Sequence, residues 1–484
     1  MNLSNIKKVH IIGIGGCASS AIAELLINNG INVSGSEMKY KKGLEYLEKM
    51  GIKIDYRHSK DNLTSIDGYP DVVLYSPAVL ALDPDNEEVN ESRVNNIPLI
   101  SWQKFVGDYL NQKGKTGITV SGSEGKGTTA GILTTILKGT DFDPLSILGA
   151  KVKNICKENS DSNIYIGKGE TYILEGDEYN RNFYSYRPGI NITVNFAYEH
   201  PETYKDFNQY QEAFYHFFKE MNSPKTLVLR ATNNLINFID KFQISNTHKI
   251  LWYGKKEEIE FVDSGIDVYL IEKTTISQNG ISFELVVGNK RFPFKVNSLP
   301  EYLIYNATGA IIAAFELGLP YETIRDNLLN FRGMVRRFDV SRTKNDGIFI
   351  TDYGHSPESL NHIIDEIKNI YKDRKLHTIF QPHLFSRTLN FFTGFTEALK
   401  KSDRVSLIDI YPAREKESEW KDKISVENLY DALKKSGSNV FYAGKSCEIE
   451  KTLTDKIDES EVTLFIGAGD MDLYYPKIFE KFFI

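Results

Sequence analysis

Short strand-like runs, rich in Val, Ile and Thr, alternate with helical patterns along most of this chain. The clearest runs are KVHII, DVVLY, GITVS, TYILE, INITV, GIFIT, HTIFQ, RVSLI and VTLFI. This alternation predicts an α/β protein with mainly parallel sheets, because parallel strands need helical crossovers between them. Nearly every run leads into a small or polar residue that begins a loop. Ligands of open α/β sheets bind at those carboxyl ends, so we expect the functional residues there.

The length of 484 residues corresponds to about three domains, at roughly 100–200 residues per domain. A polar stretch at 111–117 resembles a linker, and a helical pattern ends at 331–333 before a new strand. We therefore expect a Rossmann-like domain over 1–113, a central P-loop ATPase-type mixed sheet over 114–333, and a C-terminal Rossmann-like domain over 334–484. Alternating polar and apolar residues from about 241 to 295, with NG at 279–280, predict hairpins on the central domain.

Composition excludes several classes of function. The formal net charge is -7 and no long basic block occurs, which argues against a nucleic-acid partner. Cys17, Cys156 and Cys447 are too far apart for a zinc motif or a disulfide framework, and they fit a reducing compartment. The longest apolar stretch, 307–319, is interrupted by a glycine and a glutamate. We expect a cytoplasmic protein without membrane insertion.

A first glycine loop follows the first strand and opens a helix. Gly13, Gly15 and Ala18 fit the pattern G-x-G-x-x-A, and Glu37 is an acidic residue near the end of the next strand. Glycines let the backbone approach a diphosphate, and the helix N-terminus supplies N–H donors. The pattern indicates a nucleotide site, for which NAD is the usual ligand. The alternative is a tight strand–helix turn that binds nothing.

A second glycine loop, at 121–129, lies between a strand and the helical pattern AGILTTIL. Its sequence SGSEGKGTT indicates a phosphate-binding loop, with backbone N–H groups and Lys126 facing the phosphates. Gly127 stands where a magnesium-binding hydroxyl is usual, and Thr128 is the nearest replacement. The alternative is a surface turn with a solvated lysine. The candidate nucleotide-binding residues of this loop are Gly122, Ser123, Gly125, Lys126, Gly127, Thr128 and Thr129.

The second loop is similar to the G-[ST]-x-G-K loop of the Mur ligases and folylpolyglutamate synthetases. The remaining motifs resemble those of the Mur ligase family, and the match runs from about Val9 to Asp470. The motifs that carry it are VSGSE at 33–37, YS at 75–76, NE at 86–87, EGDEY at 175–179, EH at 199–200, FRGMVRRF at 331–338, DYGH at 352–355, QPHLFSRT at 381–388, YPARE at 411–415 and GAGD at 467–470.

The resemblance implies a role for particular residues. The first glycine loop would hold the diphosphate of a UDP-sugar rather than NAD. The implied UDP-sugar contacts are Gly13, Gly15, Gly16, Ser36, Glu37 and Ser76. For ATP, the resemblance implies Asn306 at the adenine, Asp352 at the ribose and Arg337 at the transferring phosphoryl group. The implied amino-acid contacts are Tyr353, His355, His383 and Arg387.

The resemblance also implies a magnesium site. A carboxylate and a histidine at strand ends beside a phosphate loop are suitable ligands for this ion. Glu175 and Thr128 would hold the magnesium of ATP, and His200 would serve a second ion. Together with Lys126 and Arg337, Glu175 and His200 form the expected catalytic set.

The implied activity is that of an ATP-dependent, ADP-forming amide ligase in peptidoglycan precursor synthesis. It would join an amino acid, with L-alanine as the first expectation, to the carboxylate of UDP-N-acetylmuramate through an acyl phosphate. Departures from the family pattern at Gly127, Ala197 and Leu384 leave alternatives open. One is a ligase that returns a whole muropeptide to UDP-N-acetylmuramate, and another is a UDP-sugar-binding pseudoenzyme. A dinucleotide oxidoreductase is a more distant alternative, and we expect a monomer or homodimer.

Overall fold

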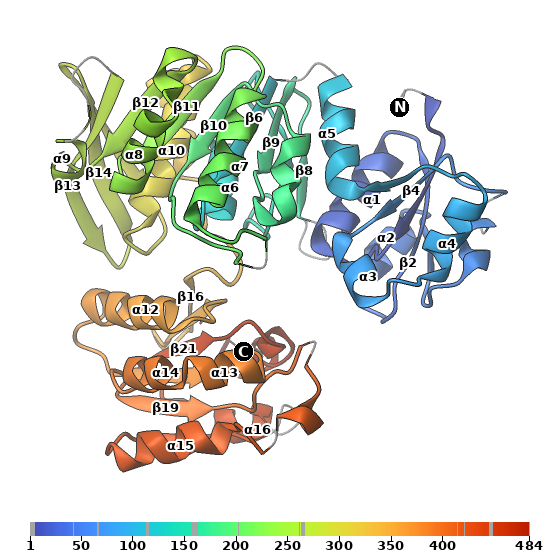
Figure 1. Ribbon diagram of the computed structural model, residues 1–484. Helices are drawn as coiled ribbons and strands as arrows, with labels where there is room; N and C mark the ends of the chain where they lie inside the picture. Colours follow the sequence, from blue (N-terminus) through green and yellow to red (C-terminus); the bar gives the residue numbers. More distant parts are fainter. Residues whose placement is uncertain are drawn as a thin grey trace. The chain divides into compact units, whose positions relative to one another are not determined.

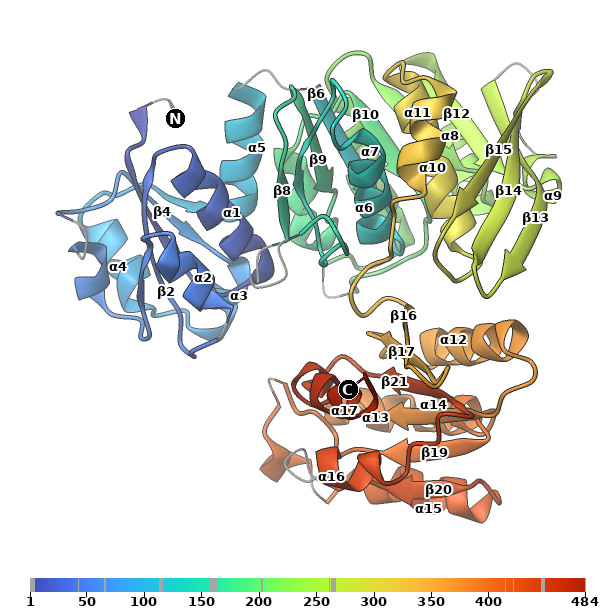
Figure 2. The same cartoon turned by 180° about the vertical axis from the view of Figure 1, so that it is seen from behind.

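The computed structural model describes residues 5–41, 43–64, 67–112, 116–156, 163–201, 203–260, 262, 267–413, 415–420, 422–444 and 449–483. Its strands form three separate sheets with helices beside them (Figure 1; Figure 2), which confirms the predicted α/β class. The chain divides into two compact units. The first comprises Met1–Thr275, Ile281–Ser298 and Tyr302–Arg332, and the second comprises Ile276–Gly280, Leu299–Glu301 and Gly333–Ile484. The boundary expected at 113–114 falls outside the described residues, so the three domain ranges stay predictions.

The first sheet has the order β3-β2-β1-β4-β5, and its strands are parallel. The strands are β1 (Lys8–Ile12), β2 (Asn32–Ser36), β3 (Lys53–Asp55), β4 (Val72–Tyr75) and β5 (Leu99–Ser101). The helices are α1 (Cys17–Asn28), α2 (Leu44–Lys49), α3 (Pro77–Leu82), α4 (Glu87–Val94) and α5 (Trp102–Gln112). The strand order reverses between β1 and β4. The first glycine loop follows β1, so it lies where ligands of such sheets bind.

The second sheet is mixed, with the order β15-β14-β13-β12-β11-β10-β6-β9-β7-β8. Its strands are β6 (Thr116–Ser121), β7 (Leu145–Ile147), β8 (Ile164–Ile166), β9 (Thr171–Glu175), β10 (Ile190–Thr193), β11 (Thr226–Arg230), β12 (Lys249–Gly254), β13 (Asp267–Ser277), β14 (Gly280–Val287) and β15 (Lys290–Val296). The strands from β13 to β7 pair in parallel, whereas β14 with β15 and β7 with β8 are antiparallel. The antiparallel pairs therefore border a parallel centre.

Helices cover both faces of the second sheet, as the two opposite views show (Figure 1; Figure 2). They are α6 (Lys126–Leu137), α7 (Phe207–Lys219), α8 (Asn233–Lys241), α9 (Lys256–Ile259), α10 (Leu303–Glu316) and α11 (Tyr321–Leu328). α10 packs against α6 and is apolar on nearly all sides, as is typical of a helix within a core. Within the described part of the chain, no helix is both long enough and apolar enough to cross a bilayer.

The third sheet belongs to the second unit and has the order β16-β17-β21-β18-β19-β20. Its strands are β16 (Asp339–Arg342), β17 (Ile348–Asp352), β18 (Leu376–Phe380), β19 (Arg404–Leu407), β20 (Val440–Tyr442) and β21 (Val462–Ile466). Its helices are α12 (Pro357–Ile370), α13 (Phe385–Asn390), α14 (Phe392–Leu399), α15 (Val426–Lys435), α16 (Ile449–Thr454) and α17 (Tyr475–Phe483). Because β17, β21 and β18 are adjacent and parallel, their carboxyl ends meet at one edge.

Candidate active site

The second glycine loop joins β6 to α6 in the centre of the second sheet. Gly122 and Gly125 have φ of +117° and +81°, a region that glycine adopts without steric cost. A Cβ at Gly122 would lie 2.3 Å from the carbonyl oxygen of Asn195, so only glycine fits there. Among the described residues, no side chain caps the N-terminus of α6, which begins at Lys126. Its first N–H groups can therefore bind an anion.

Lys126 is held by acceptors of the protein itself. Its Nζ donates to the carbonyl oxygens of Gly122 at 2.6 Å and Ser123 at 3.3 Å, and to both carboxylate oxygens of Glu178 at 3.0 Å. Burial alone would lower the pKa of Lys126. The neighbouring carboxylates outweigh burial, with Glu178 contributing most, and the pKa lies above its ordinary value. Lys126 is therefore a stable cation at the mouth of the loop.

Two acidic residues and a histidine converge beside this lysine. Glu178, Glu199 and His200 each offer one side-chain atom that could bind a metal ion, and these three atoms all lie within 4.8 Å of one another. The Nε2 of His200 is 3.6 Å from the nearer carboxylate oxygen of Glu178, whose side chain is fully buried. Burial raises the pKa of Glu199 to about 6, and Glu178 adds to the rise. Carboxylate oxygens with an imidazole nitrogen suit a divalent cation, so these residues fit the expected magnesium.

Glu175, at the end of β9, lies against the start of α6. Its carboxylate accepts a hydrogen bond from the backbone N–H of Gly149. A Cβ at Gly127 would lie 2.8 Å from the nearer carboxylate oxygen of Glu175. The missing side chain at Gly127 therefore leaves the space that Glu175 fills. This contact gives a physical reason for glycine at a position where the family usually has a hydroxyl.

The residues after Gly127 and one residue of α10 complete the surroundings of the loop. Thr128 is 8% exposed, whereas Thr129 has no exposed surface. Asn306 on α10 faces the loop, because a Cβ at Gly125 would lie 2.7 Å from its Oδ1. Its Nδ2 is buried and has no hydrogen-bond partner among the described residues. Such an amide can donate to a ligand, as the expected adenine contact requires.

The first glycine loop is tied to the ends of β2 and β4. The N–H groups of Gly13 and Ile14 donate to the carbonyl oxygen of Ser36 at 2.9 and 3.0 Å. The N–H of Gly15 donates to the carboxylate of Glu37 at 3.0 Å. Ser76 precedes α3, and its Cβ would lie 4.0 Å from a Cβ at Gly13. The structure thus gathers the expected UDP-sugar contacts at one edge of the first sheet, including Gly16, the residue before α1.

Ser36 is the exception within that group, because its side chain has no exposed surface. Its hydroxyl donates to the carboxylate of Glu88 at 2.7 Å. In this arrangement the hydroxyl does not reach a ligand. Only the backbone of Ser36 meets the glycine loop, so its direct contact with a UDP-sugar stays a prediction.

In the second unit, Asp352 ends β17 and organises the backbone around it. Its two carboxylate oxygens accept from the N–H groups of Phe338 and Gly354, both at 2.7 Å. Burial raises the pKa of Asp352, although these bonds and Arg337 oppose the rise. Arg337 lies over the ring of Tyr353 at 5.4 Å. Arg337 and Asp352 belong to one unit and Lys126 to the other.

The expected amino-acid contacts follow β17 and β18. The ring of His355 is 5.6 Å from that of Tyr353 and 6.2 Å from that of His383. Arg387 donates to the Nδ1 of His383 at 3.0 Å. Burial lowers the pKa of His355, and Arg387 lowers it further. A neutral imidazole and a guanidinium beside aromatic rings suit an amine that carries a carboxylate. Arg414, in the 411–415 motif, lies outside the described residues.

Sequence reasoning gave no role to Glu178 or Glu199, although both lie within motifs that it used. The strand order contains the signal that could have found them. Both residues follow the strands that flank β6, namely β9 and β10, and parallel neighbours bring their carboxyl ends together. An acidic residue after either strand is therefore a candidate neighbour of Lys126.

Comparisons with known proteins agree with this architecture. Residues 8–113 match the profile of the Mur ligase family, catalytic domain, residues 120–314 that of the Mur ligase middle domain, and residues 336–469 that of the Mur ligase, glutamate ligase domain. A curated UDP-N-acetylmuramate–L-alanine ligase of Sulfurihydrogenibium sp. (strain YO3AOP1) is 32% identical over 474 residues, which cover 96% of each chain. The chain belongs to the Mur ligase family.

Two solved structures resemble the whole chain. The UDP-N-acetylmuramate-alanine ligase of Thermotoga maritima has a TM-score of 0.77 at 25% identity, and the match covers 98% of each chain. A murein peptide ligase of Psychrobacter arcticus 273-4 has a TM-score of 0.68 at 20% identity, again over 98% of each chain. The second similarity concerns the fold alone.

Proposed function

We propose that the chain is an ATP-dependent, ADP-forming ligase that joins L-alanine to the carboxylate of UDP-N-acetylmuramate. The observation that carries the proposal is the similarity, over nearly the full length, to relatives that bear this name. The reaction would supply a peptidoglycan precursor, and we place it in the cytoplasm. The Lys126 loop with its acidic neighbours supports phosphoryl transfer in particular.

The first step would activate the carboxylate of the sugar. One carboxylate oxygen attacks the γ-phosphorus of ATP, the bond to ADP breaks, and an acyl phosphate forms. Such transfer depends on positioning and on neutralisation of charge. Lys126 would turn from Glu178 to the phosphates, while the uncapped N-terminus of α6 binds their oxygens. Asn306 would hold the adenine through its Nδ2, which has no hydrogen-bond partner in the described part of the chain.

Magnesium, when bound, would neutralise the phosphates and the leaving ADP. We propose that Thr128, Glu175 and His200 hold it, and we add Glu178 and Glu199 as candidates because of their convergence with His200. Glu175 reaches the start of α6 without obstruction, since Gly127 has no side chain.

The second step would form the amide. A neutral amine attacks the carbonyl carbon of the acyl phosphate, phosphate leaves, and the amine loses a proton. Arg387 would bind the α-carboxylate of the amino acid, and Tyr353, His355 and His383 would surround it. The lowered pKa of His355 keeps its imidazole neutral near pH 7, so a second positive charge does not oppose the amine.

Phosphate release tests the proposal directly. The protein is mixed with ATP, magnesium and UDP-N-acetylmuramate, and each of L-alanine, glycine, L-serine and a muropeptide is added in turn. We expect release that depends on both the UDP-sugar and L-alanine, with ADP and the L-alanyl product found by mass spectrometry. Release with the muropeptide but not with L-alanine would instead establish the recycling ligase. Binding of the UDP-sugar without any ADP would establish the pseudoenzyme.

A further inference from the structure

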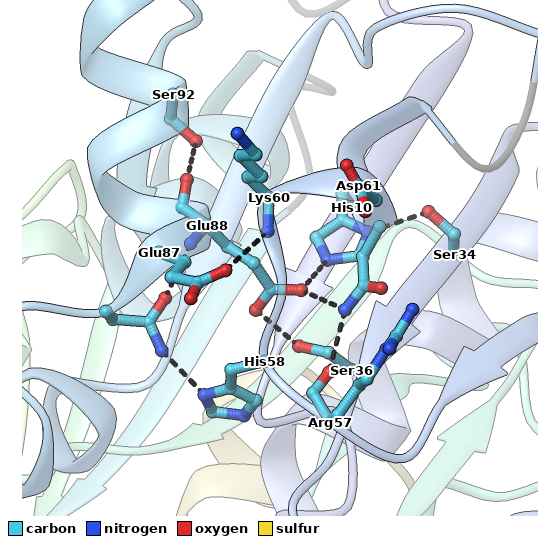
Figure 3. A network of polar contacts seen from close by, with 12 residues as sticks. His10, Ser34, Ser36, Arg57, His58, Lys60, Asp61, Glu87, Glu88 and Ser92 are labelled. Atoms are coloured by element: carbon cyan, nitrogen blue, oxygen red, sulfur yellow. Dashed lines mark hydrogen bonds and ion pairs between the residues drawn. The ribbon is translucent and has the colours of Figure 1, made fainter.

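A buried carboxylate lies at the centre of a polar network in the first sheet (Figure 3). Glu88, on α4, has no exposed surface. One of its carboxylate oxygens accepts from the Nε2 of His10 at 3.2 Å and from the Nδ2 of Asn62 at 2.7 Å. The other accepts from the hydroxyl of Ser36 at 2.7 Å. Three donors from three different segments thus meet on one side chain.

Placing a carboxylate in a protein core costs free energy. A buried carboxylate loses its hydration, and hydrogen bonds from the protein must replace it. A well-packed apolar group often serves stability as well as a buried ion pair does. Glu88 and His10 are both fully buried, and Ser34 forms a hydrogen bond with the other ring nitrogen of His10 at 2.8 Å. The network therefore points to a positional role for Glu88.

One branch of the network leads to the first glycine loop. Ser36 is bound to Glu88 through its hydroxyl, while its carbonyl oxygen accepts from the N–H groups of Gly13 and Ile14. The next residue, Glu37, accepts from the N–H of Gly15. A shift of Ser36 would therefore move the backbone that binds the loop and the carboxylate beside it.

A second branch leads to the segment 57–62, which follows β3. The Nδ2 of Asn62 donates both to Glu88 and to the carbonyl oxygen of Arg57, the latter at 2.7 Å. Asn86 caps α4 by accepting from the N–H groups of Glu88 and Val89, and its Nδ2 lies 2.6 Å from the Nδ1 of His58. The start of α4 thereby fixes this segment at the carboxyl edge of the sheet.

We propose that Glu88 is a positioning residue for the UDP-sugar. It holds the first glycine loop and the segment 57–62 in one arrangement, so that the UDP-sugar binds to a site that is already ordered at the carboxyl edge of the first sheet. The inference rests on the proposed function, because that function supplies the UDP-sugar. Preformed sites bind more tightly than sites that must first become ordered, so loss of this anchor weakens binding without removing a direct contact.

Glu88→Gln is a sharp probe because it keeps the shape of the side chain. The glutamine oxygen must face His10 and Asn62, which both donate, and this places its NH2 group against the hydroxyl of Ser36. Ser36 then loses its acceptor. Glu91→Gln is the matched control, because Glu91 lies on the same helix and its carboxylate instead accepts from Tyr69 and Asn95.

Calorimetry with UDP-N-acetylmuramate and, separately, with ADP tests the inference on the folded full-length variants. We expect Glu88→Gln to raise the Kd for the UDP-sugar about tenfold and to leave the Kd for ADP within about twofold, since the charge-assisted hydrogen bond that is lost belongs to the first sheet and Lys126 follows a strand of the second. Glu91→Gln should change neither constant. Ser36→Ala should act like Glu88→Gln, and the double variant should lose little more than either single one.

A folded Glu88→Gln protein with a wild-type Kd for the UDP-sugar would overturn the inference. An equal loss of UDP-sugar and ADP binding would overturn it too, because that indicates a general structural role. If Glu88→Gln does not fold, Ser36→Ala and Asn62→Ala decide, since each removes one branch only; wild-type binding by both would count against the proposal. Failure of the wild type to bind the UDP-sugar would remove the proposed function, and this inference with it.

Discussion

Thr128 and Thr129 follow each other in α6 but lie in different surroundings, which makes them a test of the metal assignment. Thr128 retains some exposure, whereas Thr129 is fully buried and its Oγ1 has no hydrogen-bond partner among the described residues. We expect Thr128→Ala to raise the magnesium concentration for half-maximal turnover about tenfold, because a direct ligand to the metal is lost. Titration of phosphate release with magnesium measures this.

Thr129→Ala is the control for that experiment. It removes a buried hydroxyl that no described residue pairs with, so it should change the magnesium requirement little and cost little stability. If Thr129 were the sensitive residue, or if both variants behaved alike, the assignment of Thr128 to the metal would be wrong.

Arg387 is the one arginine in the 381–388 motif, since Leu384 stands at the other basic position of the family pattern. Arg387→Ala should raise the KM for the amino acid about tenfold or more, because hydrogen bonds to a charged carboxylate are among the strong ones. The KM for ATP should change much less. Steady-state kinetics with each substrate varied in turn separates the two constants, and an equal rise in both would contradict a binding role for Arg387.

At this scale the sequence identified residue types better than it identified their partners. It placed Lys126 in a phosphate loop, but the partner Glu178 is 52 positions away along the chain. Only the strand order β10-β6-β9 brings the two together. Ser36 shows the same limit: its motif predicted a substrate contact, while its burial against Glu88 depends on a helix that follows much later in the chain.

Whole elements could be predicted more fully, because short buried strands have a strong local signature. Every strand-like run named from the sequence forms a strand. The prediction of hairpins over 241–295 was right only from β13 onward. The segment 249–254 is β12, a strand of the parallel region, and 256–259 is the helix α9. A buried parallel strand and a hairpin strand share the same composition, and only their neighbours distinguish them.

His377, on β18, should make the second unit sensitive to acid. Its Nδ1 accepts from Arg404 at 3.1 Å, so its Nε2 donates to Ser406 at 2.8 Å. Burial lowers the pKa of His377 to about 3 from the ordinary value of 6.5, and Arg404 lowers it further. Between these two pH values, His377 is therefore protonated in the unfolded chain and neutral in the folded protein. Stability should fall between pH 6.5 and 3, by up to about 1.4 kcal/mol per pH unit.

Urea unfolding of the protein at several pH values measures this dependence. His377→Gln should flatten it, because glutamine does not take up a proton in this range. The exposed His362 on α12 offers a control, since His362→Gln leaves the buried site intact. An unchanged slope for His377→Gln would show that other groups cause the loss of stability in acid.

For the whole molecule, the presence of two glycine loops on two different sheets predicts that their ligands bind independently. Lys126→Ala removes the lysine of the second glycine loop and changes no residue of the first sheet. We expect ATP turnover to fall at least about a hundredfold, because a preorganised positive charge at the reacting group is lost. The Kd for UDP-N-acetylmuramate should not change. Phosphate release and calorimetry on the same preparation provide the two measurements.

A fully active Lys126→Ala protein would end the phosphate-loop assignment. A loss of UDP-sugar binding in a folded variant would instead show that the two sites depend on each other. Glu124→Gln is a useful companion variant, because it removes a negative charge from the same loop and should not abolish turnover.

The pairing of Lys126 with Glu178 has a thermodynamic consequence for how ligands arrive. When Lys126 turns to a phosphate, a fully buried carboxylate loses its cation and must gain another cation or a proton. The nearby His200 and a divalent ion are the available replacements. Nucleotide and metal should therefore favour each other's binding by the same factor, since such coupling is reciprocal. A nucleotide affinity measured in the presence of a metal chelator would then be lower than the affinity of the same loop with the metal bound.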